Sequence, residues 1–271
     1  MRNKDSLISM DRKSYLKGIK KKKYIVLFFQ IFIFVVFLAI WEVAATKGFI
    51  DEFITSKPSR IVDTFMNLTS NDLLKHIAVT TYETIVGFLL GTIIGTIIAI
   101  ILWLSEYLSK IFEPYLVILN SLPKVALGPI IIIWVGAGTP AIIVMAVAIS
   151  LIVTILENLN GFLETDKELI KMAKTFNASK FQILTKIVIP ANINTFINSL
   201  KVNIGLSLVG VISGEFLVSK AGLGYLIVYG GQVFKLDLVM TSVIILGILA
   251  GVMYGAVLLL EKIITKKRLK V

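Results

Sequence analysis

Long apolar runs constrain this chain more than any other feature of its sequence. Runs of about 18 residues or more recur along its 271 residues and are separated by short polar stretches. A helix made from such a run is long enough to cross a hydrocarbon layer about 30 Å thick. The sequence has no series of long segments in which polar and apolar residues alternate, as membrane β-barrels have. The pattern therefore predicts an all-α integral membrane protein.

The composition agrees with a membrane protein and excludes several kinds of functional site. Only 17% of the residues are charged and the mean hydropathy is +0.88, whereas soluble domains have about 25% charged residues. The chain has no cysteine and one histidine, His76. This excludes disulfides, thiolate metal sites, cysteine nucleophiles and a zinc site built from several histidines. We expect no catalytic residues, no metal and no cofactor.

Six membrane spans can be placed on the apolar runs. Pro123 and Pro129 break the third span, and Gly87, Gly91 and Gly95 recur at four-residue spacing in the second. The glycines predict close helix packing, either within the chain or between two copies. The first span is too long for the apolar core of a signal peptide, so we expect it to be retained. The expected spans are residues 24–45, 77–104, 115–135, 139–157, 191–217 and 239–261.

The basic residues predict the orientation of these spans. Nine of the 28 Lys and Arg residues lie in 1–23 and five in 262–271. We expect both to be basic cytoplasmic tails flanking a permease domain over 24–261, since cytoplasmic ends are rich in Lys and Arg. The net charge of +11 could instead indicate nucleic-acid binding. The position of the charge beside apolar runs argues against a nucleic-acid partner and for a bilayer.

This orientation assigns each connection to one side of the membrane. Residues 105–114 and 158–190 are expected inside, and residues 46–75, 135–140 and 218–238 outside. A short external helix is expected within 51–75, after a turn at Ser56–Ser59. Residues 158–190 carry five lysines, as the positive-inside rule predicts for a cytoplasmic connection.

The cytoplasmic connection has a helical pattern of its own. Ile170, Ala173 and Phe176, with Met172, place apolar side chains at helical spacing on a segment that acidic residues precede. Asn177 tolerates the left-handed conformation that ends helices, and Ser179 can cap a second helix. A helix, a turn and a helix are therefore expected before Pro190. Two roles stay open on these grounds: a docking element for a partner, or an ordinary amphipathic interfacial segment.

The same segment resembles the EAA loop of binding-protein-dependent ABC importer permeases. Aligned on Pro190, Ala173 and Ile187 match that pattern in register. Asn177 stands where the family has Gly, and can adopt the same backbone conformation. Lys171 and Met172 replace the Glu and the first Ala of the family pattern.

Three further motifs extend the resemblance over most of the chain, towards the permeases for nitrate, sulfonate and taurine. They follow in the family's order, and each lies where a six-span permease would have it. The motifs are Trp41-Glu42, the stretch Leu122–Gly138 with its Leu-Pro-Lys and Trp-Val-Gly-Ala-Gly elements, and Gly214-Glu215-Phe216 followed by Gly222-Leu223-Gly224.

The resemblance implies a type I importer permease with a MetI-like fold. Its partners would be a cytoplasmic ABC ATPase dimer, a second permease subunit that completes a homodimer, and an external substrate-binding protein, in a bacterial cell membrane. The chain contains no phosphate-binding loop of its own, so ATP hydrolysis is expected on the partner. Residues 158–190 would be the coupling segment. Its expected ATPase-coupling residues are Glu168, Met172, Ala173, Asn177, Ser179, Ile187 and Pro190.

The alternative is an ion-coupled secondary transporter or a channel, which would use ionisable groups inside the membrane. Glu83, Lys124, Lys201 and Glu215 are the candidates, but an ion relay needs deeper or paired groups. A membrane enzyme is disfavoured because no nucleophile and base, and no metal ligands, stand out. The polar side chains expected along a translocation pathway are Glu83, Asn120, Ser121, Asn203, Ser207 and Glu215.

Glu83 bears on the substrate. It is expected to be a solvated residue near the outer interface or a partner for a neighbouring helix. A carboxylate near the outer pathway would repel an anion such as a sulfonate or nitrate. The expected substrate is therefore a small organic compound or anion, with thiamine-precursor-like and riboflavin-like compounds left open beside sulfonate-like and nitrate-like ones.

Overall fold

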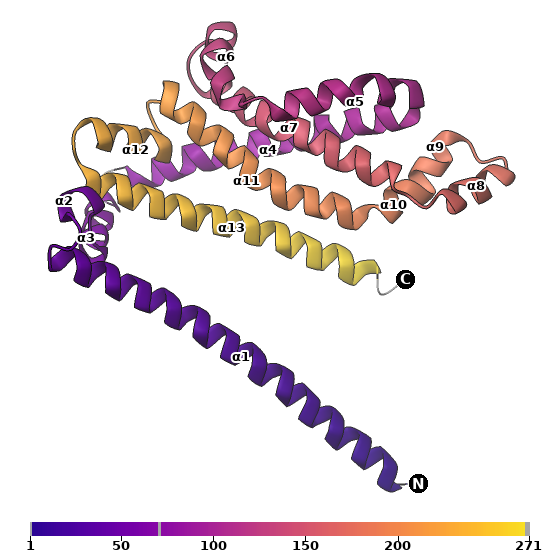
Figure 1. Ribbon diagram of the computed structural model, residues 1–271, viewed down its shortest axis with the longest axis horizontal. Helices are drawn as coiled ribbons and strands as arrows, with labels where there is room; N and C mark the ends of the chain where they lie inside the picture. Colours follow the sequence, from indigo (N-terminus) through magenta and orange to yellow (C-terminus); the bar gives the residue numbers. More distant parts are fainter. Residues whose placement is uncertain (1, 70–71, 269–271) are drawn as a thin grey trace. The chain divides into compact units, whose positions relative to one another are not determined.

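The computed structural model describes residues 2–69 and 72–268, which are mainly α-helical and contain no strand (Figure 1). They form two compact units, residues 1–64 and 65–271. The first unit contains α1 (Arg2–Thr46), α2 (Glu52–Thr55) and the start of α3 (Pro58–Thr69). An all-α fold is thus confirmed for the described chain.

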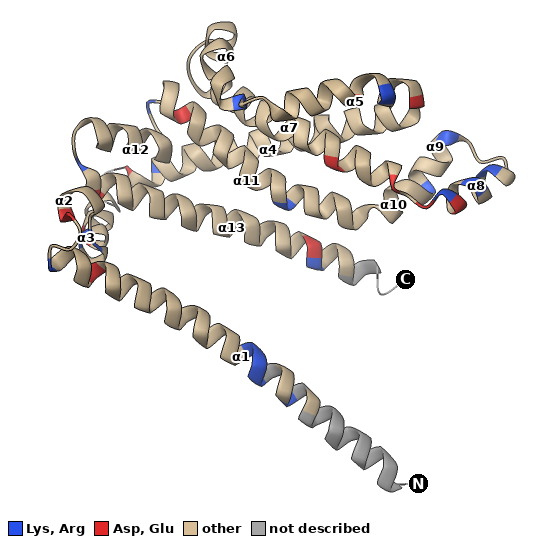
Figure 2. Ribbon diagram, viewed as in Figure 1, with Lys and Arg blue, Asp and Glu red and all other residues tan. Residues whose placement is uncertain are grey.

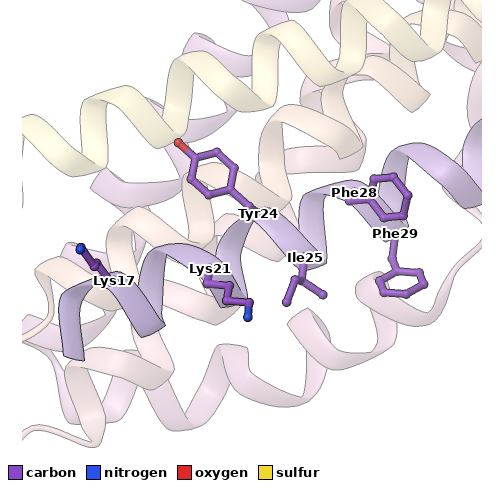
Figure 3. Close-up of a pocket in the computed structure, with 6 residues that line it drawn as sticks. All are labelled: Lys17, Lys21, Tyr24, Ile25, Phe28 and Phe29. Atoms are coloured by element: carbon purple, nitrogen blue, oxygen red, sulfur yellow. The ribbon is translucent and has the colours of Figure 1, made fainter. Parts of the chain in front are cut away.

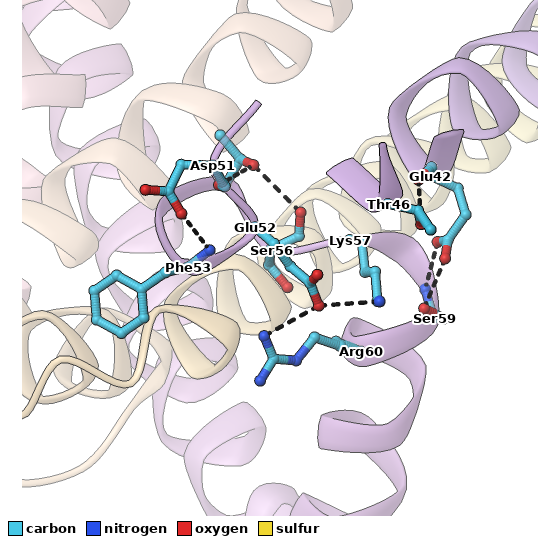
Figure 4. A network of polar contacts seen from close by, with 10 residues as sticks. Glu42, Thr46, Asp51, Glu52, Phe53, Ser56, Lys57, Ser59 and Arg60 are labelled. Carbon is cyan, nitrogen blue, oxygen red and sulfur yellow. Dashed lines mark hydrogen bonds and ion pairs between the residues drawn. The ribbon is translucent and has the colours of Figure 1, made fainter. Parts of the chain in front are cut away.

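The end of α1 is joined to α2 and α3 by a polar network (Figure 4). Glu42 accepts hydrogen bonds from the Ser59 backbone N–H at 3.0 Å and from its hydroxyl at 2.8 Å. Glu52 pairs with Lys57 at 3.0 Å and with Arg60 at 3.3 Å. The expected turn before a short helix is present, and α3 begins at Pro58, where a missing backbone N–H costs nothing.

Residues 17–46 of α1 are apolar enough to cross a membrane. Their side chains are mostly exposed, and Lys17, Lys21, Tyr24 and Phe28 line a shallow hollow of about 500 Å³ (Figure 3). Residues of α1 alone form its walls. A hollow on one helix offers no enclosed surface for a ligand, so we assign no binding role to it.

The second unit carries the other candidate spans, and in Figure 2 their helices are mostly free of charged residues. Its long helices are α4, α7, α11 and α13, each with an 18-residue window apolar enough to span. Shorter helices connect them. The elements are α4 (Leu73–Leu104), α5 (Glu106–Ser121), the 3-10 helix η1 (Lys124–Leu127), α6 (Gly128–Val135), α7 (Thr139–Leu163), α8 (Lys167–Thr175), α9 (Lys180–Ile183), the π-helix η2 (Leu184–Val188), α10 (Ile189–Ala191), α11 (Ile193–Val218), α12 (Leu223–Gln232) and α13 (Leu236–Arg268).

The third expected span differs most from its prediction. Residues 115–135 are not one helix, because α5 and the stretch Lys124–Val135 meet at a bend of 88°. The chain breaks at Leu122 and Pro123, since the residue before a proline avoids the helical region and Leu122 is extended. The described chain therefore has five helices that are long and apolar enough to span a membrane, or six candidate spans if the bent pair counts as one. Residues 106–114, expected as a connection, belong to α5.

Helix α7 packs between α4 and α11, and small residues allow close approach. A Cβ placed on Gly87 would lie 2.5 Å from the Ala146 Cβ, and one on Gly95 would lie 2.7 Å from the Thr154 Cβ. Gly91 faces Ser150 in the same way. Larger residues would force the helices apart, so these glycines pack within the chain, the first of the two expected alternatives.

Polar side chains add links between the same helices. The Asn203 amide donates to the Thr154 hydroxyl at 2.6 Å and joins α11 to α7. The Asn158 amide donates to the Thr96 hydroxyl at 3.0 Å and joins α7 to α4. Hydrogen bonds of this kind fix helix pairing where water cannot compete. The three helices are therefore held as one framework.

The framework has two differently built ends. Helices α8, α9 and α10 lie at one end, and α12 lies at the other (Figure 1). Lys and Arg are frequent on α8 and α9 (Figure 2). Helix α12 is an addition to the expected architecture, because residues 218–238 were expected to be a connection.

Candidate functional site

The coupling segment contains the expected helix, turn and helix. Asp166 caps α8 by accepting a hydrogen bond from the Glu168 backbone N–H at 2.8 Å. Ser179 caps α9 through a reciprocal box, in which the Gln182 N–H donates to the Ser179 hydroxyl and the Gln182 side chain accepts from the Ser179 N–H. Such boxes satisfy two unpaired donors at a helix start. The predicted cap at Ser179 is confirmed.

Asn177 makes the turn between α8 and α9. Its φ is +56°, in the left-handed region that asparagine enters more easily than most residues. The Asn177 N–H donates to the Lys174 carbonyl at 2.9 Å, and the Ala178 N–H donates to that of Ala173 at 3.1 Å. The backbone groups that end α8 are thereby paired. The conformation expected for Asn177 is confirmed.

The chain re-enters the membrane framework through η2 and α10. Pro190 has no N–H to donate, and its ring would crowd the carbonyl of residue 186 in a regular α-helix. The wider π turn over Leu184–Val188 precedes this proline, and such turns relieve crowding of this kind. Asn192 then starts α11, and its amide donates to the Thr165 hydroxyl at 2.7 Å.

One face of the coupling segment is buried against the ends of α4 and α7. Ala173 is 8% exposed and belongs to a cluster with Leu184, Val188 and Phe162. Trp103, near the end of α4, donates its indole N–H to the Phe162 carbonyl at 3.2 Å. Packed side chains therefore connect α8 to the ends of α4 and α7.

A neighbouring face of the segment, directly beside Ala173 on α8, is apolar and exposed. Leu169 is 42% exposed, Met172 53%, Phe176 80% and Phe181 66%. We call these four side chains the coupling face. The first three are spaced at i, i+3 and i+7, so they lie on one side of α8. Large exposed apolar side chains gathered on a charged segment mark a site of interaction.

The expected coupling residues divide between these two faces. Met172 lies on the coupling face, and Glu168 is exposed in the first turn of α8. Ala173 is buried, and Ile187 and Pro190 are half-buried. Because these three side chains are wholly or partly covered, they would contribute to docking through the shape of the segment and not through direct contact. Of the coupling face, only Met172 was among the expected coupling residues. Leu169, Phe176 and Phe181 were missed, because periodicity alone does not say which face is covered.

At the other end of the framework, three backbone N–H groups at the start of α12 donate to side chains from α4 and α11. The Gly222 N–H donates to His76 Nδ1 at 3.0 Å, and the Leu223 N–H donates to the Thr80 hydroxyl at 2.8 Å. The Gly224 N–H donates to Glu215 Oε2 at 2.5 Å. These are the donors that a helix start leaves unpaired.

Thr80 and Glu215 are also bonded to each other. The Thr80 hydroxyl donates to Glu215 Oε1 at 2.6 Å, and both residues are buried. Gly222 has a φ of +118°, and a Cβ there or at Gly224 would collide with the Glu215 side chain. Glycine is therefore required at both positions, which explains the Gly-Leu-Gly motif in physical terms.

Glu83 lies beside Glu215 and near Thr139, and is fully buried. Neither of its carboxyl oxygens has a hydrogen-bond partner. The expectation of a solvated residue near the interface is wrong, because α7 and α11 cover this part of α4. The other expectation, a pairing with a neighbouring helix, is not met by a hydrogen bond, although Glu83 lies between helices. We call Glu83 and Glu215 the glutamate pair.

Comparison with protein families identifies the chain. Residues 91–270 match the model of the binding-protein-dependent transport system inner membrane component, about two thirds of the chain. The chain belongs to this family. It is an all-α integral membrane permease of an ABC importer, a transport subunit, as the resemblance implied; the ion-coupled alternative is not favoured.

Individual proteins with similar sequences are also named as permeases. The permease is 31% identical to a probable ABC transporter permease protein of Haemophilus influenzae over 78% of this chain and 86% of the relative. It is 26% identical to a putative aliphatic sulfonates permease, SsuC, of Bacillus subtilis over 86% and 85%. It is 29% identical to the riboflavin permease RibX of Chloroflexus aurantiacus over 84% and 86%.

A solved structure supports the fold. The permease superposes on a chain of the MetNI methionine ABC transporter with a TM-score of 0.62, over 68% of this chain and 92% of that one, at 20% identity. The MetI-like arrangement expected from the sequence is therefore confirmed. At this identity the likeness concerns architecture alone.

The expected pathway residues lie in different environments in the permease. Asn120 and Ser121 are exposed at the end of α5, beside the 88° bend, and Asn120 accepts from Lys124. Asn203 and Ser207 are fully buried in α11. Lys201 forms an ion pair with Glu261 at 2.8 Å. Among Asn120, Ser121, Asn203 and Ser207, only the first two are exposed at the surface of the single chain.

Proposed function

We propose that the permease is moved by a separate cytoplasmic ATPase that docks on the coupling face. The observation that carries this proposal is the exposure of Leu169, Met172, Phe176 and Phe181 on a segment whose neighbouring side is packed into the spans. Apolar groups in water favour a partner surface. The lysines beside them would complement acidic side chains at the rim of that partner surface.

The coupling segment would transmit closure of the ATPase to the spans. Ala173 and its cluster link α8 to the ends of α4 and α7, and Lys180 donates to the Leu104 carbonyl at 3.3 Å. ATP must bind the outward-open assembly more tightly than the inward-open one for this movement to be driven. Glu168, Asn177, Ser179, Ile187 and Pro190 would hold the segment in its docking shape.

The assembly would contain two permease subunits, two ATPases and an external binding protein. Family membership supports this arrangement. The exposed apolar side chains of α6, among them Ile133 and Trp134, would contact lipid or the second subunit. The pathway would pass Asn120 and Ser121, with Asn203, Ser207 and the glutamate pair supporting the helices that surround it.

Orientation follows from charge. We place both termini and the coupling segment in the cytoplasm of a bacterial cell and α12 on the outer side, because about twenty of the 28 basic residues then face inward. On this basis residues 1–23 and 262–271 are basic cytoplasmic tails, and 24–261 is the permease domain.

The substrate is a small organic compound or anion. Relatives named for aliphatic sulfonates and for riboflavin support this class. The burial of Glu83 removes its charge from the pathway surface, and with it the argument against an anion. Radiolabelled uptake of sulfonates and of riboflavin by cells that carry or lack the permease would separate the two.

Docking can be tested with Phe176→Glu. We expect loss of ATPase co-purification and of ATP-driven uptake, because a carboxylate would be buried without a partner in the interface. Phe234→Glu is the matched control, since Phe234 is 72% exposed at the other end of the framework; it should keep the ATPase bound. Normal ATPase binding by the Phe176→Glu protein would contradict the proposal.

A further inference from the structure

Two carboxyl groups lie side by side within the membrane framework with few partners. Glu83 is 0% exposed and Glu215 2%. Glu215 receives two hydrogen bonds, from Thr80 and from the Gly224 N–H, whereas both oxygens of Glu83 are unpartnered. Two buried and adjacent carboxylates would repel each other at high cost.

No cation compensates for this charge among the described residues. In the part that the structure describes, neither glutamate forms an ion pair, and no group of three or more His, Cys, Asp or Glu side chains is present to bind a metal. Protonation of one carboxyl would remove the repulsion. A protonated carboxyl also becomes a donor, and donation to the other carboxylate would give Glu83 a partner.

We propose that Glu83 and Glu215 bind one proton between them, and that this proton locks the start of α12 onto α4 and α11. Glu83 carries the proton and donates it in a hydrogen bond to Glu215. Glu215 stays ionised and keeps its bonds to Thr80 and the Gly224 N–H. This site is separate from the coupling segment and does not depend on the identity of the ATPase.

Loss of the proton would open the lock. The proton passes to water, and two carboxylates are left at the start of α12. Their repulsion moves Glu215 away from the Gly224 N–H, and the loop 219–222 is released. Thr139 lies near Glu83 and also borders a cavity of about 400 Å³ lined by Val79, Ser219 and Lys220, which supplies a route for the proton.

Other titratable groups lie on the elements around the pair. His76 on α4 accepts from the Gly222 N–H, and its protonation would remove that acceptor in acid. Lys220 lies in the loop and Tyr225 on α12, and neither is hydrogen-bonded to a glutamate of the pair. Lys235 and Asp237 lie at the start of α13, which packs on α12. Lys124 donates to Asn120.

The test uses the full chain in membrane vesicles. The chain has no cysteine, so Ala221→Cys provides a single labelling site in the loop without background. The thiolate that reacts with the label itself becomes about tenfold more abundant per pH unit below the pKa of a cysteine, so the labelling rate is divided by that of a Phe234→Cys reference, at a residue that is 72% exposed. We expect this ratio to rise by up to about tenfold per pH unit in alkali, because only the open loop has lost the proton. In the Glu83→Gln background this alkaline rise should disappear, because the amide donates to Glu215 at every pH.

Two controls separate the glutamate pair from its neighbours. Glu157→Gln changes another glutamate of the spans whose Oε2 is buried and unpartnered, and should leave the alkaline rise unchanged. His76→Gln should alter labelling in acid only. An alkaline rise that persists in the Glu83→Gln protein would overturn the proposal.

A spectroscopic measurement detects the proton directly. Infrared spectra of the vesicles should contain the carbonyl band of a buried protonated carboxylic acid, and Glu83→Gln should remove it. If the band is absent, or if labelling at constant pH follows the concentration of sodium or potassium, the pair holds a metal cation and the proposal fails.

Discussion

The coupling segment and the start of α12 both have to pair the free backbone groups of helix ends, and they use different partners. In the coupling segment the partners are local: Asp166 and Ser179 cap helices that begin one residue later. At α12 the partners come from two other helices, and Thr80 lies 143 residues from the N–H that it accepts. Local caps can form before the helices assemble, whereas remote caps require the assembled framework.

The difference between local and remote caps also determines which function suits each end of the framework. The locally capped segment keeps its shape with one face uncovered, which suits a surface that docks and moves. The remotely capped end buries its polar groups between helices, so any change in their charge alters how those helices are held. Substitutions that break one kind of cap and leave the other intact test this contrast.

The largest effect is expected from Gly222→Ala. The substituted residue would be strained at a φ of +118°, and its Cβ would displace the Glu215 carboxyl. We expect the free energy of unfolding to fall by about 3 kcal/mol, from backbone strain and a lost buried hydrogen bond. Thermal unfolding of the purified chain measures it. Gly231→Ala, in open space on the same helix, should be neutral or slightly stabilising, and equal losses in both would refute the remote cap.

A smaller loss is expected from Thr80→Val, which keeps the shape and removes the hydroxyl. The Leu223 N–H would lose its acceptor and Glu215 a donor. Leaving such groups buried and unpaired costs about 2 kcal/mol. Thr84→Val is the control, because the Thr84 hydroxyl bonds only to the Thr80 carbonyl of its own helix. Similar melting temperatures for the two variants would contradict the role given to Thr80.

The local cap should be weaker. Ser179→Ala removes one half of the capping box, and we expect a cost of about 1 kcal/mol confined to the coupling segment. Hydrogen exchange of α9 should become faster while that of α12 stays unchanged. Thr185→Ala, which removes an exposed hydroxyl bonded to its own helix, serves as control. Faster exchange at both ends would show that the two caps are not independent.

The smallest effect is expected at Asn177. Asn177→Gly relieves what strain remains at a φ of +56°, so stability should change by less than about 0.5 kcal/mol. Asn177→Val should cost about 1 kcal/mol or more, since a β-branched residue disfavours this conformation. Comparison of the two melting temperatures checks the assignment. Equal values would mean that backbone conformation does not determine the residue here.

The sequence predicted the features that depend on neighbouring residues. The spans, the left-handed turn at Asn177, the cap at Ser179 and the glycine packing all follow from spacing within one segment. The burial of Glu83 did not follow, because it depends on α7 and α11 lying over α4. Helix α12 was missed for a related reason: its first donors are paired by His76, Thr80 and Glu215, and a search for local capping residues does not find them.

The bend before α6 is a third feature that the sequence predicted only in part. Pro123 marked the break correctly, but the turn of 88° is a property of how the chain continues after it. Likewise, the spacing of Ile170, Ala173 and Met172 predicted a helix without indicating which side would be covered. Packing partners from α4 and α7 decide that Ala173 lies inside and Met172 outside.

The π-helix η2 has a geometric consequence for the joint between the coupling segment and α11. A π turn holds about one residue more than an α turn, and each residue of an α-helix turns the chain by about 100°. Deletion of one residue within Leu184–Val188 would therefore convert the wide turn into an ordinary α turn and leave the direction of α8 and α9 about the helix axis nearly unchanged. Deletion of one residue from a regular turn of α11 would instead rotate them by that angle, and the coupling face would point in another direction. The π turn is thus the place in this joint where the chain can lose one residue without re-aiming the docking surface.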